Sequence, residues 1–575
     1  MNPVAQIGRV YRPPFIRSIS AIAPGKPGEL LYLDEAVGCI SRLSLESGQT
    51  IGVLNRSCWR ELRDATSFLT DGEEIWYGLQ GEIHAFSISD NARKKRRIRV
   101  DGLTDIVGLS RVGTRVCAAC RDGLVAILDT ELNPISTFRI GATLDSACMH
   151  RDDGEEVLAC LDSSNRRIIF VSLDGMQRFA LAVPHEGATA IASVPPTGSS
   201  ATKGNGALYV AYVRNTWEVV DDIFEEAGNE PNIVLKRNTL HALIERLTYR
   251  KERLEGNGTL SLSSGYRVEM EVIHRLHPPR EMLKELAQLR ANVWLSIPRT
   301  SSRQRIVCFE PIGDLPFSMG KDLHGEPTVE FDLSRVRLDE EMVSLGFRVV
   351  LDLFNARWFF PPMNFPTSLP EEVRHHLREE KRLDMHRPEM KKIVDRILAD
   401  LDTSRRNDLF AVARAIREYV YERLDYRHTG RETSPLQTLD DGEGTCGKYT
   451  DVLLALLKLA GIPCRQVGDY KVPEYKLEYG PVGQEAKPDY DHVWIEFWIP
   501  GAGWIPMESS SDDLPGKHDR FLAALPWINV EFSRTEVSKD IIDIETGESA
   551  VSNDLNFRDL FERETRFRIL EELEP

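Results

Sequence analysis

The sequence predicts a multidomain protein that is mainly β, with an α+β region at its C-terminal end. Three observations support this prediction. Short apolar strands recur along residues 1–225, alternating strand patterns follow along residues 266–360, and several helical segments follow a proline-rich joint at residues 361–366. At 575 residues the chain is too long for a single hydrophobic core, so several domains are expected.

Charge and composition narrow the function classes. The net charge of −17 argues against nucleic acid or an anionic membrane as a partner. Met1–Gln6 has no apolar core of a signal peptide, and no apolar window is long enough to span a bilayer. The nine cysteines are an odd number spread over a long chain, which is typical of a reducing compartment. We therefore expect a cytoplasmic protein.

Residues 1–225 contain a repeated strand pattern. Five strand-like segments follow one another at intervals of 41 to 51 residues, and a turn and a second strand come after each. They begin at Leu30, Ile75, Val116, Val157 and Leu208. This period is typical of β-propeller blades, which bury their faces only against neighbouring blades. We predict a β-propeller-like repeat domain of open blade number, with a β-sandwich of coincidental spacing as the alternative.

The middle of the chain divides into a connection and a second β domain. Residues 226–265 are mixed and charged, and Leu240–Arg253 is predicted as a short helix within this connecting segment. Arg267–Ile273 and Phe347–Leu353 alternate between apolar and polar residues, as half-buried strands do. Residues 266–360 are therefore predicted to form an antiparallel β-sandwich.

Residues 361–575 are predicted to form an α+β domain. Apolar residues at helical spacing predict one helix over Leu409–Leu424. A second helix is expected over Cys446–Ala460, ended by Gly461 and followed by a proline. Strand patterns dominate beyond it, and the acidic tail Glu571–Glu574 is expected to fray.

Cys446 is the candidate nucleophile. It follows the glycine-rich segment Gly442–Gly444 and stands at the predicted start of a helix. Unpaired N–H groups and the positive end of the helix dipole lower the pKa of a thiol there, which makes the sulfur reactive. The alternative is a structural cysteine, because free cysteines are among the most buried residues.

His492 and Glu508 are the candidate partners of this thiol. Residues 492–499 alternate in character, so His492 lies on the face opposite the apolar Val493. If the following hairpin turns near Pro500, Glu508 comes roughly across from His492 and can orient the imidazole. A solvated strand end is the alternative for Glu508. Asp512 and Asp513 compete for the same role from beyond the expected strand.

These segments together resemble the core of the transglutaminase-like superfamily of cysteine enzymes. The resemblance rests on the surroundings of Cys446, the helix exit Gly461–Arg465, His492–Trp494 and Gly503–Pro506. It implies a papain-like α+β catalytic core in which Cys446 is the nucleophile and His492 the general base and acid. Glu508 occupies the place where the family usually has an aspartate, so its longer carboxylate must retract or the histidine must shift.

The resemblance also implies an oxyanion site and a substrate cleft. The backbone N–H of Cys446 is the natural oxyanion donor, and Tyr426 is the side-chain candidate. Residues 471–491 are expected to form a loop over the cleft, with three tyrosines that could bind substrate. These are Tyr475, Tyr479 and Tyr490.

The implied activity is cleavage of peptide or glutamine amides through a thioester, and we favour a protease or amide hydrolase. The alternatives are a protein-glutamine acyltransferase that crosslinks proteins and an inactive core used as a binding scaffold. A protein or peptide would be the substrate, and a protein partner could dock on the repeat domain. No phosphate-binding loop, zinc-protease motif or calcium loop is present, and Cys117–Cys120 is interpreted as core, so no cofactor or metal is expected.

Overall fold

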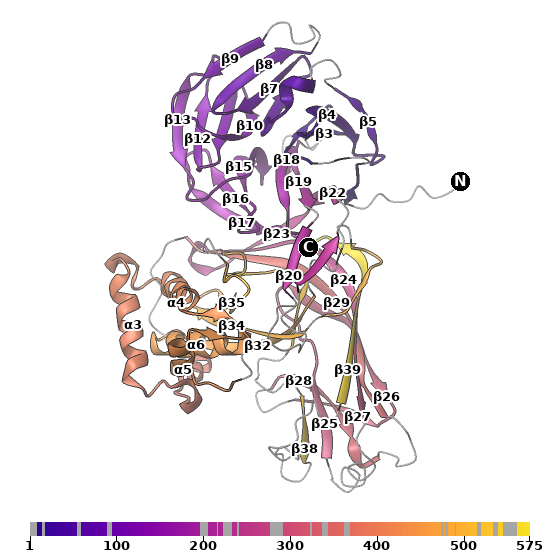
Figure 1. Ribbon diagram of the computed structural model, residues 1–575, viewed down its shortest axis with the longest axis vertical. Coiled ribbons are helices and arrows are strands. Elements are labelled where there is room, and N and C mark those ends of the chain that lie inside the picture. The colour runs from indigo at the N-terminus through magenta and orange to yellow at the C-terminus, as the bar shows by residue number, and fades with distance from the viewer. Residues whose placement is uncertain are drawn as a thin grey trace, which may run out of the picture.

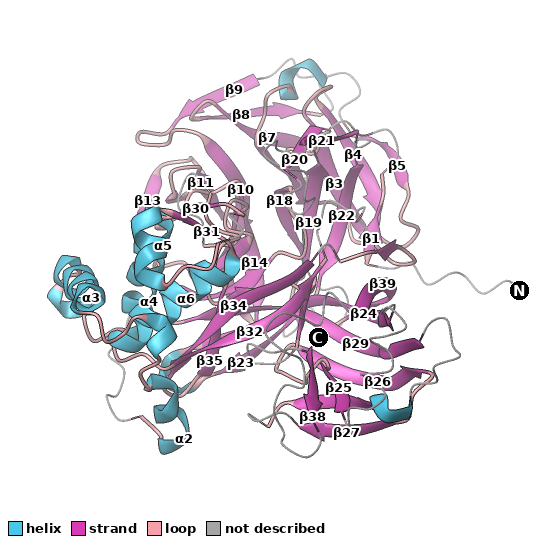
Figure 2. Cartoon of the chain, turned by 60° about the horizontal axis from the view of Figure 1, so that its bottom comes forward, coloured by secondary structure: helices cyan, strands magenta, loops and turns pink. Residues whose placement is uncertain are grey.

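The fold is described here from a computed structural model of the full chain (Figure 1). The structure describes residues 9–13, 16, 18–54, 59–88, 95–195, 205–214, 217–221, 233–237, 241–276, 291–321, 325–335, 343–361, 369–428, 431–472, 477, 481–488, 490–514, 519–532, 539–543 and 561–575. It is mostly β, as predicted, and the labelled α-helices gather on one side of the molecule (Figure 2).

The N-terminal part, which we call the repeat unit, consists of five four-stranded antiparallel sheets. The first contains β2 (Ala21–Pro24), β3 (Glu29–Asp34), β4 (Cys39–Ser44) and β5 (Thr50–Val53). The second contains β6 (Ser67–Thr70), β7 (Glu74–Leu79), β8 (Glu82–Ser87) and β9 (Lys95–Arg99). The third contains β10 (Ile106–Val112), β11 (Arg115–Cys120), β12 (Leu124–Leu128) and β13 (Pro134–Arg139).

The last two sheets differ in how they are completed. The fourth contains β14 (Ser146–Asp152), β15 (Glu155–Asp162), β16 (Arg167–Ser172) and β17 (Gln177–Ala182). The fifth has the order β1 (Val10–Tyr11), β22 (His241–Leu247), β19 (Ala207–Arg214) and β18 (Ala188–Val194), so the N-terminal strand closes it. A separate hairpin pairs β20 (Trp217–Asp221) with β21 (Ile233–Arg237). The five predicted segments are β3, β7, β11, β15 and β19, the second strand of each sheet after β2, β6, β10, β14 and β18, so the repeat is confirmed.

The first strands of the five sheets pack against one another. β2 contacts β6, β6 contacts β10, β10 contacts β14, β14 contacts β18, and β18 contacts β2. Small residues permit this approach: a Cβ on Gly108 of β10 would lie only 2.7 Å from the Cβ of Ala147 in β14. A cavity of about 400 Å³ lies between these strands. Cys117 and Cys120 are buried in β11, in agreement with the interpretation of this pair as core.

The predicted helix at Leu240–Arg253 is wrong. These residues form β22 and β23 (Tyr249–Arg253), with no helix among the described residues of this range. β22 lies between two strands of the fifth sheet, and Leu243, Ile244 and Leu247 are buried there. Pairing on both edges outweighs the weak local preference of a short segment. The repeat unit therefore includes residues beyond 225.

Two further β-sheets share one hydrophobic core, and we call them the two-sheet unit. The larger sheet has the order β26 (Gln304–Gly313), β29 (Val343–Phe359), β24 (Thr259–Leu276), β39 (Phe561–Leu573) and β33 (Glu485–Ala486), with β23 and β36 (Ala524–Leu525) at its margins. The smaller has the order β27 (Phe317–Lys321), β28 (Pro327–Asp332), β25 (Ala291–Ser296) and β38 (Lys539–Asp543). Strands from the C-terminal end thus complete a unit that begins near residue 249.

The expectation of a frayed acidic tail is wrong for most of its residues. Glu571 and Glu572 lie in β39 and pair in register with Arg267 and Tyr266 of β24. Arg267 also forms an ion pair of 2.5 Å with Glu571. The alternating residues of β39 bury Phe567 and Ile569, and this burial holds the strand in the sheet.

The C-terminal α+β unit combines five described α-helices with a four-stranded sheet. The helices are α2 (Glu371–Arg374), α3 (Pro388–Asp400), α4 (Leu409–Arg423), α5 (Pro435–Asp441) and α6 (Cys446–Leu459) among the described residues. The sheet has the order β35 (Gly503–Met507), β34 (Tyr490–Ile499), β32 (Cys464–Lys471) and β37 (Asn529–Glu531). The two predicted helices are confirmed as α4 and α6, and both contact the sheet: α4 lies against β34, and α6 lies against β34 and β32.

Short elements complete the chain. A parallel pair joins β30 (Asp425–Tyr426) to β31 (Glu443–Gly444). Single turns of 3₁₀ helix are η1 (Trp59–Leu62), η3 (Glu255–Asn257), η4 (Leu333–Arg335), η5 (His375–Leu377), η6 (Lys381–Leu383) and η7 (Thr403–Arg405). Within the described ranges, no helix is both long and apolar enough to cross a membrane.

Arg9 joins the repeat unit to the two-sheet unit. Its guanidinium lies 2.8 Å from the carboxylate of Glu245 in β22 and donates hydrogen bonds to the carbonyls of Gly265 and Leu573. Both charged side chains are buried. The pair therefore connects the fifth sheet to β24 and β39 at the point where the units meet.

We expect Arg9→Met to lower the free energy of unfolding by about 3–5 kcal/mol, because it leaves Glu245 buried without its partner. The double variant Arg9→Met/Glu245→Gln should recover most of this loss. Urea unfolding followed by tryptophan fluorescence measures both. Equal stability of the single and double variants would show that the ion pair does not matter.

Candidate active site

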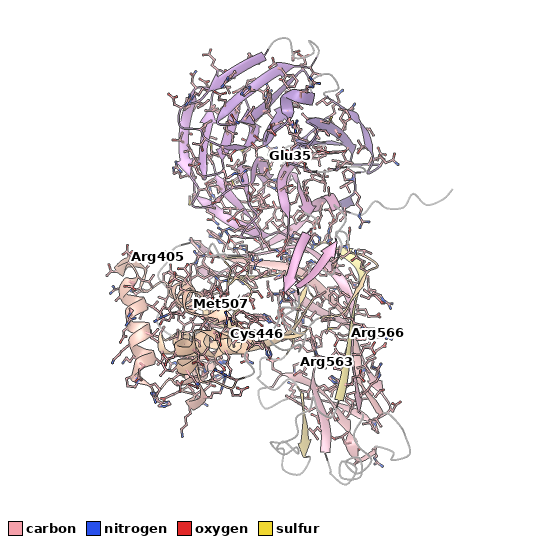
Figure 3. All side chains as sticks on the ribbon, in the orientation of Figure 1. Glu35, Arg405, Cys446, Met507, Arg563 and Arg566 are labelled. Carbon is pink, nitrogen blue, oxygen red and sulfur yellow. The ribbon has the colours of Figure 1, made fainter. Side chains whose placement is uncertain are left out.

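Cys446 is the first residue of α6, directly after the N-cap residue Thr445. The preceding helix α5 ends at Gly442, which adopts a left-handed conformation with φ of 74°. The chain then reverses through β31 and enters α6, so the thiol meets the positive end of that helix. Cys446 is half-buried in the C-terminal α+β unit (Figure 3).

His492 and Glu508 form a buried pair behind the thiol. The Nε2 atom of His492 in β34 is hydrogen-bonded to Oε1 of Glu508, the residue that follows β35. His492 is 3% exposed and Glu508 2%. A side-chain interaction joins His492 to Cys446 as well, so the structure brings the three predicted residues together.

The hairpin register explains the unusual length of the acidic side chain. Ile495 pairs with Met507, and Ile499 pairs with Gly503 at the turn. By this register Glu508 lies beyond the last pair, diagonally offset from His492 and not directly across from it as the sequence suggested. A diagonal neighbour on a sheet is within reach only of long side chains. The extra methylene of glutamate, compared with aspartate, therefore spans the offset.

The second oxygen of Glu508 is also satisfied. The backbone N–H groups of Ser510 and Ser511 donate hydrogen bonds to Oε2, and the one from Ser510 is 3.0 Å long. The two competing carboxylates are engaged elsewhere: Asp512 with Arg417 and Arg520, and Asp513 with the hydroxyl of Tyr449.

Electrostatics favour a thiolate–imidazolium pair. Burial would raise the pKa of Cys446, but the hydrogen bond and positive charge of His492 lower it below the ordinary value. Burial would lower the pKa of His492, but the carboxylate of Glu508 and the sulfur of Cys446 raise it well above the ordinary value. The pKa of Glu508 is lowered in turn, because the imidazolium outweighs its burial. Charge separation can thus exist before substrate arrives.

Tyr426 lies in β30 beside the thiol. Its hydroxyl interacts with the backbone and the side chain of Cys446. Burial and the neighbouring sulfur raise the pKa of this hydroxyl, so it keeps its proton at neutral pH and can donate a hydrogen bond. Tyr426 thus lies beside Cys446, and its oxyanion role remains a prediction.

The structure does not describe the side chains of the three tyrosines predicted to bind substrate. Tyr475 and Tyr479 lie outside the described residues. Tyr490 is the first residue of β34 and pairs with Lys471 of β32, but its side chain is outside the described part of the structure. Their role remains a prediction.

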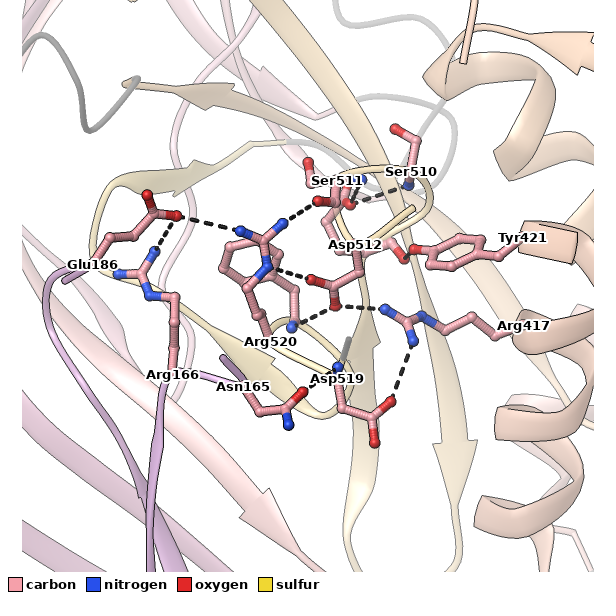
Figure 4. Close-up of polar contacts among 12 residues, drawn as sticks. Asn165, Arg166, Glu186, Arg417, Tyr421, Ser510, Ser511, Asp512, Asp519 and Arg520 are labelled. Atoms are coloured by element: carbon pink, nitrogen blue, oxygen red, sulfur yellow. Dashed lines mark hydrogen bonds and ion pairs between the residues drawn. The ribbon is translucent and has the colours of Figure 1, made fainter. Parts of the chain in front are cut away.

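The segment that carries Glu508 is anchored by ion pairs (Figure 4). We call residues 508–514 and 519–521 the Glu508 loop. Asp512 is fully buried and accepts from Arg520 Nε at 2.9 Å and from Arg417 on α4. Arg520 also donates to the carbonyl of Ser511, whose own N–H binds Glu508. The position of the Glu508 carboxylate therefore depends on Arg520 through Ser511.

The same loop contacts the repeat unit. Arg520 Nη1 lies 3.3 Å from Glu186, which also neighbours Arg166 at 3.7 Å. Asn165, in the turn between β15 and β16, accepts a 2.7 Å hydrogen bond from the N–H of Asp519 (Figure 4). Sequence reasoning missed these contacts, because no local pattern reveals which distant loop meets Arg520.

Metal ligation is not suggested by the described residues, where no group of three or more His, Cys, Asp or Glu side chains could hold an ion. The arrangement can instead perform nucleophilic chemistry with a thiolate, a proton donor and an oxyanion site.

Comparisons with known proteins agree with this geometry. Residues 395–509 match the model of the transglutaminase-like superfamily, and this span includes Cys446, His492 and Glu508. The chain is 26% identical over 156 residues to the uncharacterized protein YebA of Bacillus subtilis, covering 25% of this chain and 18% of YebA. It is 29% identical over 85 residues to a protein-glutamine gamma-glutamyltransferase of Pseudomonas aeruginosa, covering 14% of this chain and 12% of that protein.

The chain thus contains a transglutaminase-like domain but spans less than a fifth of the length of either curated relative. A solved structure from Cytophaga hutchinsonii, described as a candidate cysteine protease, aligns with a TM-score of 0.36 and 12% identity. The alignment covers 56% of this chain and 93% of that one.

We expect Arg520→Met to loosen the Glu508 loop. Loss of a buried charged hydrogen bond costs about 1–3 kcal/mol, so amide hydrogen exchange at Ser510 and Ser511 should become roughly tenfold faster or more. Mass spectrometry of the peptide that contains both serines measures this rate. Arg568→Met, which removes a largely exposed pair with Glu485, is the control. Unchanged exchange in Arg520→Met would contradict the anchoring.

Proposed function

We propose that this protein is a cysteine enzyme that cleaves peptide or glutamine amide bonds through a thioester, with hydrolysis as its main outcome. One observation carries the proposal: a cysteine at a helix start interacts with a buried histidine whose Nε2 is hydrogen-bonded to a carboxylate. A nucleophile, a base beside it and a group that orients the base are the parts of a catalytic triad.

The first half of the reaction forms the acyl-enzyme. The Cys446 thiolate attacks the carbonyl carbon of the amide, and the carbonyl oxygen becomes an oxyanion. The N–H of Cys446 and the hydroxyl of Tyr426 donate hydrogen bonds to it. The oxyanion collapses, the C–N bond breaks, and His492 gives its proton to the departing amine. Glu508 keeps the imidazole in the orientation that both steps need.

The second half consumes the thioester. Neutral His492 takes a proton from water, the resulting hydroxide attacks the thioester carbonyl, and the C–S bond breaks. The products are a carboxylic acid and the Cys446 thiolate, with the proton returned to His492. An amine in place of water would give a new amide.

Acyl transfer is the second candidate function. The relative from Pseudomonas aeruginosa carries the name of a protein-glutamine gamma-glutamyltransferase, and this favours transfer to an amine. A binding scaffold without activity is the third candidate, but the ion pair around Cys446 gives a pure binding module no advantage.

We further propose that the repeat unit is a five-bladed β-propeller that presents a docking surface for the protein substrate or for a partner. The contacts between successive first strands, including β18 with β2, support a closed ring. In this division the repeat unit extends to Leu247, and the β-sandwich consists of residues 249–359 with β38 and β39. The catalytic domain is inserted between its strands.

A mixed assay separates hydrolysis from transfer. A protein substrate such as casein is offered together with a fluorescent primary amine, and products are weighed by mass spectrometry. We expect cleaved peptides without attached amine, and no product with Cys446→Ala. Amine incorporation would identify an acyltransferase, and equal product from wild type and Cys446→Ala would exclude Cys446 as the nucleophile.

Substitutions of Glu508 test its reach. Glu508→Gln should lower kcat/KM by two or more orders of magnitude, since the orienting charge is lost. Glu508→Asp should also lower kcat/KM, by roughly tenfold or more, because the shorter side chain cannot span the diagonal to His492. We expect this loss although aspartate is the residue that the family usually has at this place. Full activity of Glu508→Asp would refute the argument from register.

A further inference from the structure

A second carboxylate lies beside His492. Asp469 of β32 is the direct cross-strand partner of His492 in β34, so the two side chains share one face of the sheet. We propose that Asp469 is a positioning residue that holds His492 through its charge, with Lys471 as the counter-charge. This inference rests on the proposed function, because it concerns the same histidine.

Asp469 is poorly satisfied for a buried acid. It is 3% exposed, and its Oδ2 accepts a hydrogen bond from the side-chain amide of Asn529 in β37. Its Oδ1 has no hydrogen-bond partner among the described residues. A buried carboxylate is expensive unless a charge compensates for it. On β34 it faces His492, and on β37 it faces Glu531, which is paired with Arg303.

The interaction is one of charge and not of hydrogen bonding. Nε2 of His492 is hydrogen-bonded to Glu508, whereas Oδ1 of Asp469 has no hydrogen-bond partner among the described residues and its Oδ2 accepts from Asn529. Burial raises the pKa of Asp469 above its ordinary value, and the positive charge of His492 opposes this rise, so the two groups interact electrostatically. Asp469 therefore stabilises the protonated imidazole without competing for its hydrogen bonds.

Lys471 completes the charge balance. It stands two residues after Asp469 on β32, hence on the same face, and its Nζ donates a 2.7 Å hydrogen bond to Oγ of Ser511. Its charge lowers the pKa of Asp469 and of Glu508. Two cations, His492 and Lys471, thus interact with the two carboxylates of Asp469 and Glu508.

The other charged or titratable neighbours come from β37, the residue before β26, α4 and β30. Glu531 of β37 pairs across the strands with Asp469, and the buried Arg303, which forms an ion pair with Glu531, also interacts electrostatically with Asp469. Arg417 of α4 interacts with Glu508, but its closest ion pair is with Asp512. Tyr426 of β30 stays protonated beside Cys446. Neither residue faces Asp469 across the strands.

The two β32 residues should act on the thiol with opposite sign. Removal of a nearby negative charge lowers the pKa of every neighbouring group, and removal of a positive charge raises it. Asp469→Asn should therefore shift the midpoint of Cys446 thiolate formation down by about one pH unit, and Lys471→Met should shift it up by about one pH unit. A loss of packing alone would not shift the two midpoints in opposite directions.

The experiment measures alkylation of Cys446 by iodoacetamide across a pH series in the full chain, with mass spectrometry of the Cys446 peptide. Glu496→Gln is the control, because Glu496 is a buried acid on the strand of His492 that pairs with Arg465. Opposite shifts with an unmoved control support the inference. If Asp469→Asn does not fold, the upward shift of the thiolate midpoint in Lys471→Met tests the inference instead.

Two negative results are distinguishable. A wild-type midpoint like that of an ordinary free thiol would overturn the proposed function, since no ion pair would exist. A lowered wild-type midpoint that neither Asp469→Asn nor Lys471→Met moves would overturn this inference and leave the proposed function standing.

Discussion

The buried pair of His492 and Glu508 is the interaction on which the rest of the site depends. An ionised carboxylate and an imidazolium lose much hydration when buried, so both must find partners in the protein. Glu508 finds them in His492 and in the N–H groups of Ser510 and Ser511. These partners exist only while the Glu508 loop holds its shape, and that shape depends on the buried ion pairs of Asp512.

The repeat unit and the two-sheet unit both contact the surroundings of this pair. The repeat unit contacts the Glu508 loop through Asn165 and Glu186. The two-sheet unit supplies the buried Arg303, which binds Glu531 and the carbonyl of Asn529, and Asn529 in turn binds Asp469. Each carboxylate near His492 is thus braced by a different unit.

The sequence predicted the local parts of this arrangement and missed its long-range parts. Helix periodicity and a glycine exit located α6, and alternation located β34, because both signals lie within a few residues. The diagonal position of Glu508 depends on hairpin register, which one residue of turn length changes. The place of β39 beside β24 joins residues about 300 positions apart, as the pair of Arg267 and Glu571 shows, and no local pattern reports such pairing.

The central claim is that Cys446 rests as a thiolate beside an imidazolium. Thiolates absorb in the ultraviolet near 240 nm, so the difference spectrum between wild type and Cys446→Ser, recorded as a pH titration, reports this group alone. We predict that the Cys446 thiolate signal persists well below the value of about 8.5 at which a free thiol titrates, and that Glu508→Gln moves its midpoint. A signal that appears only near the pKa of a free thiol would contradict the account.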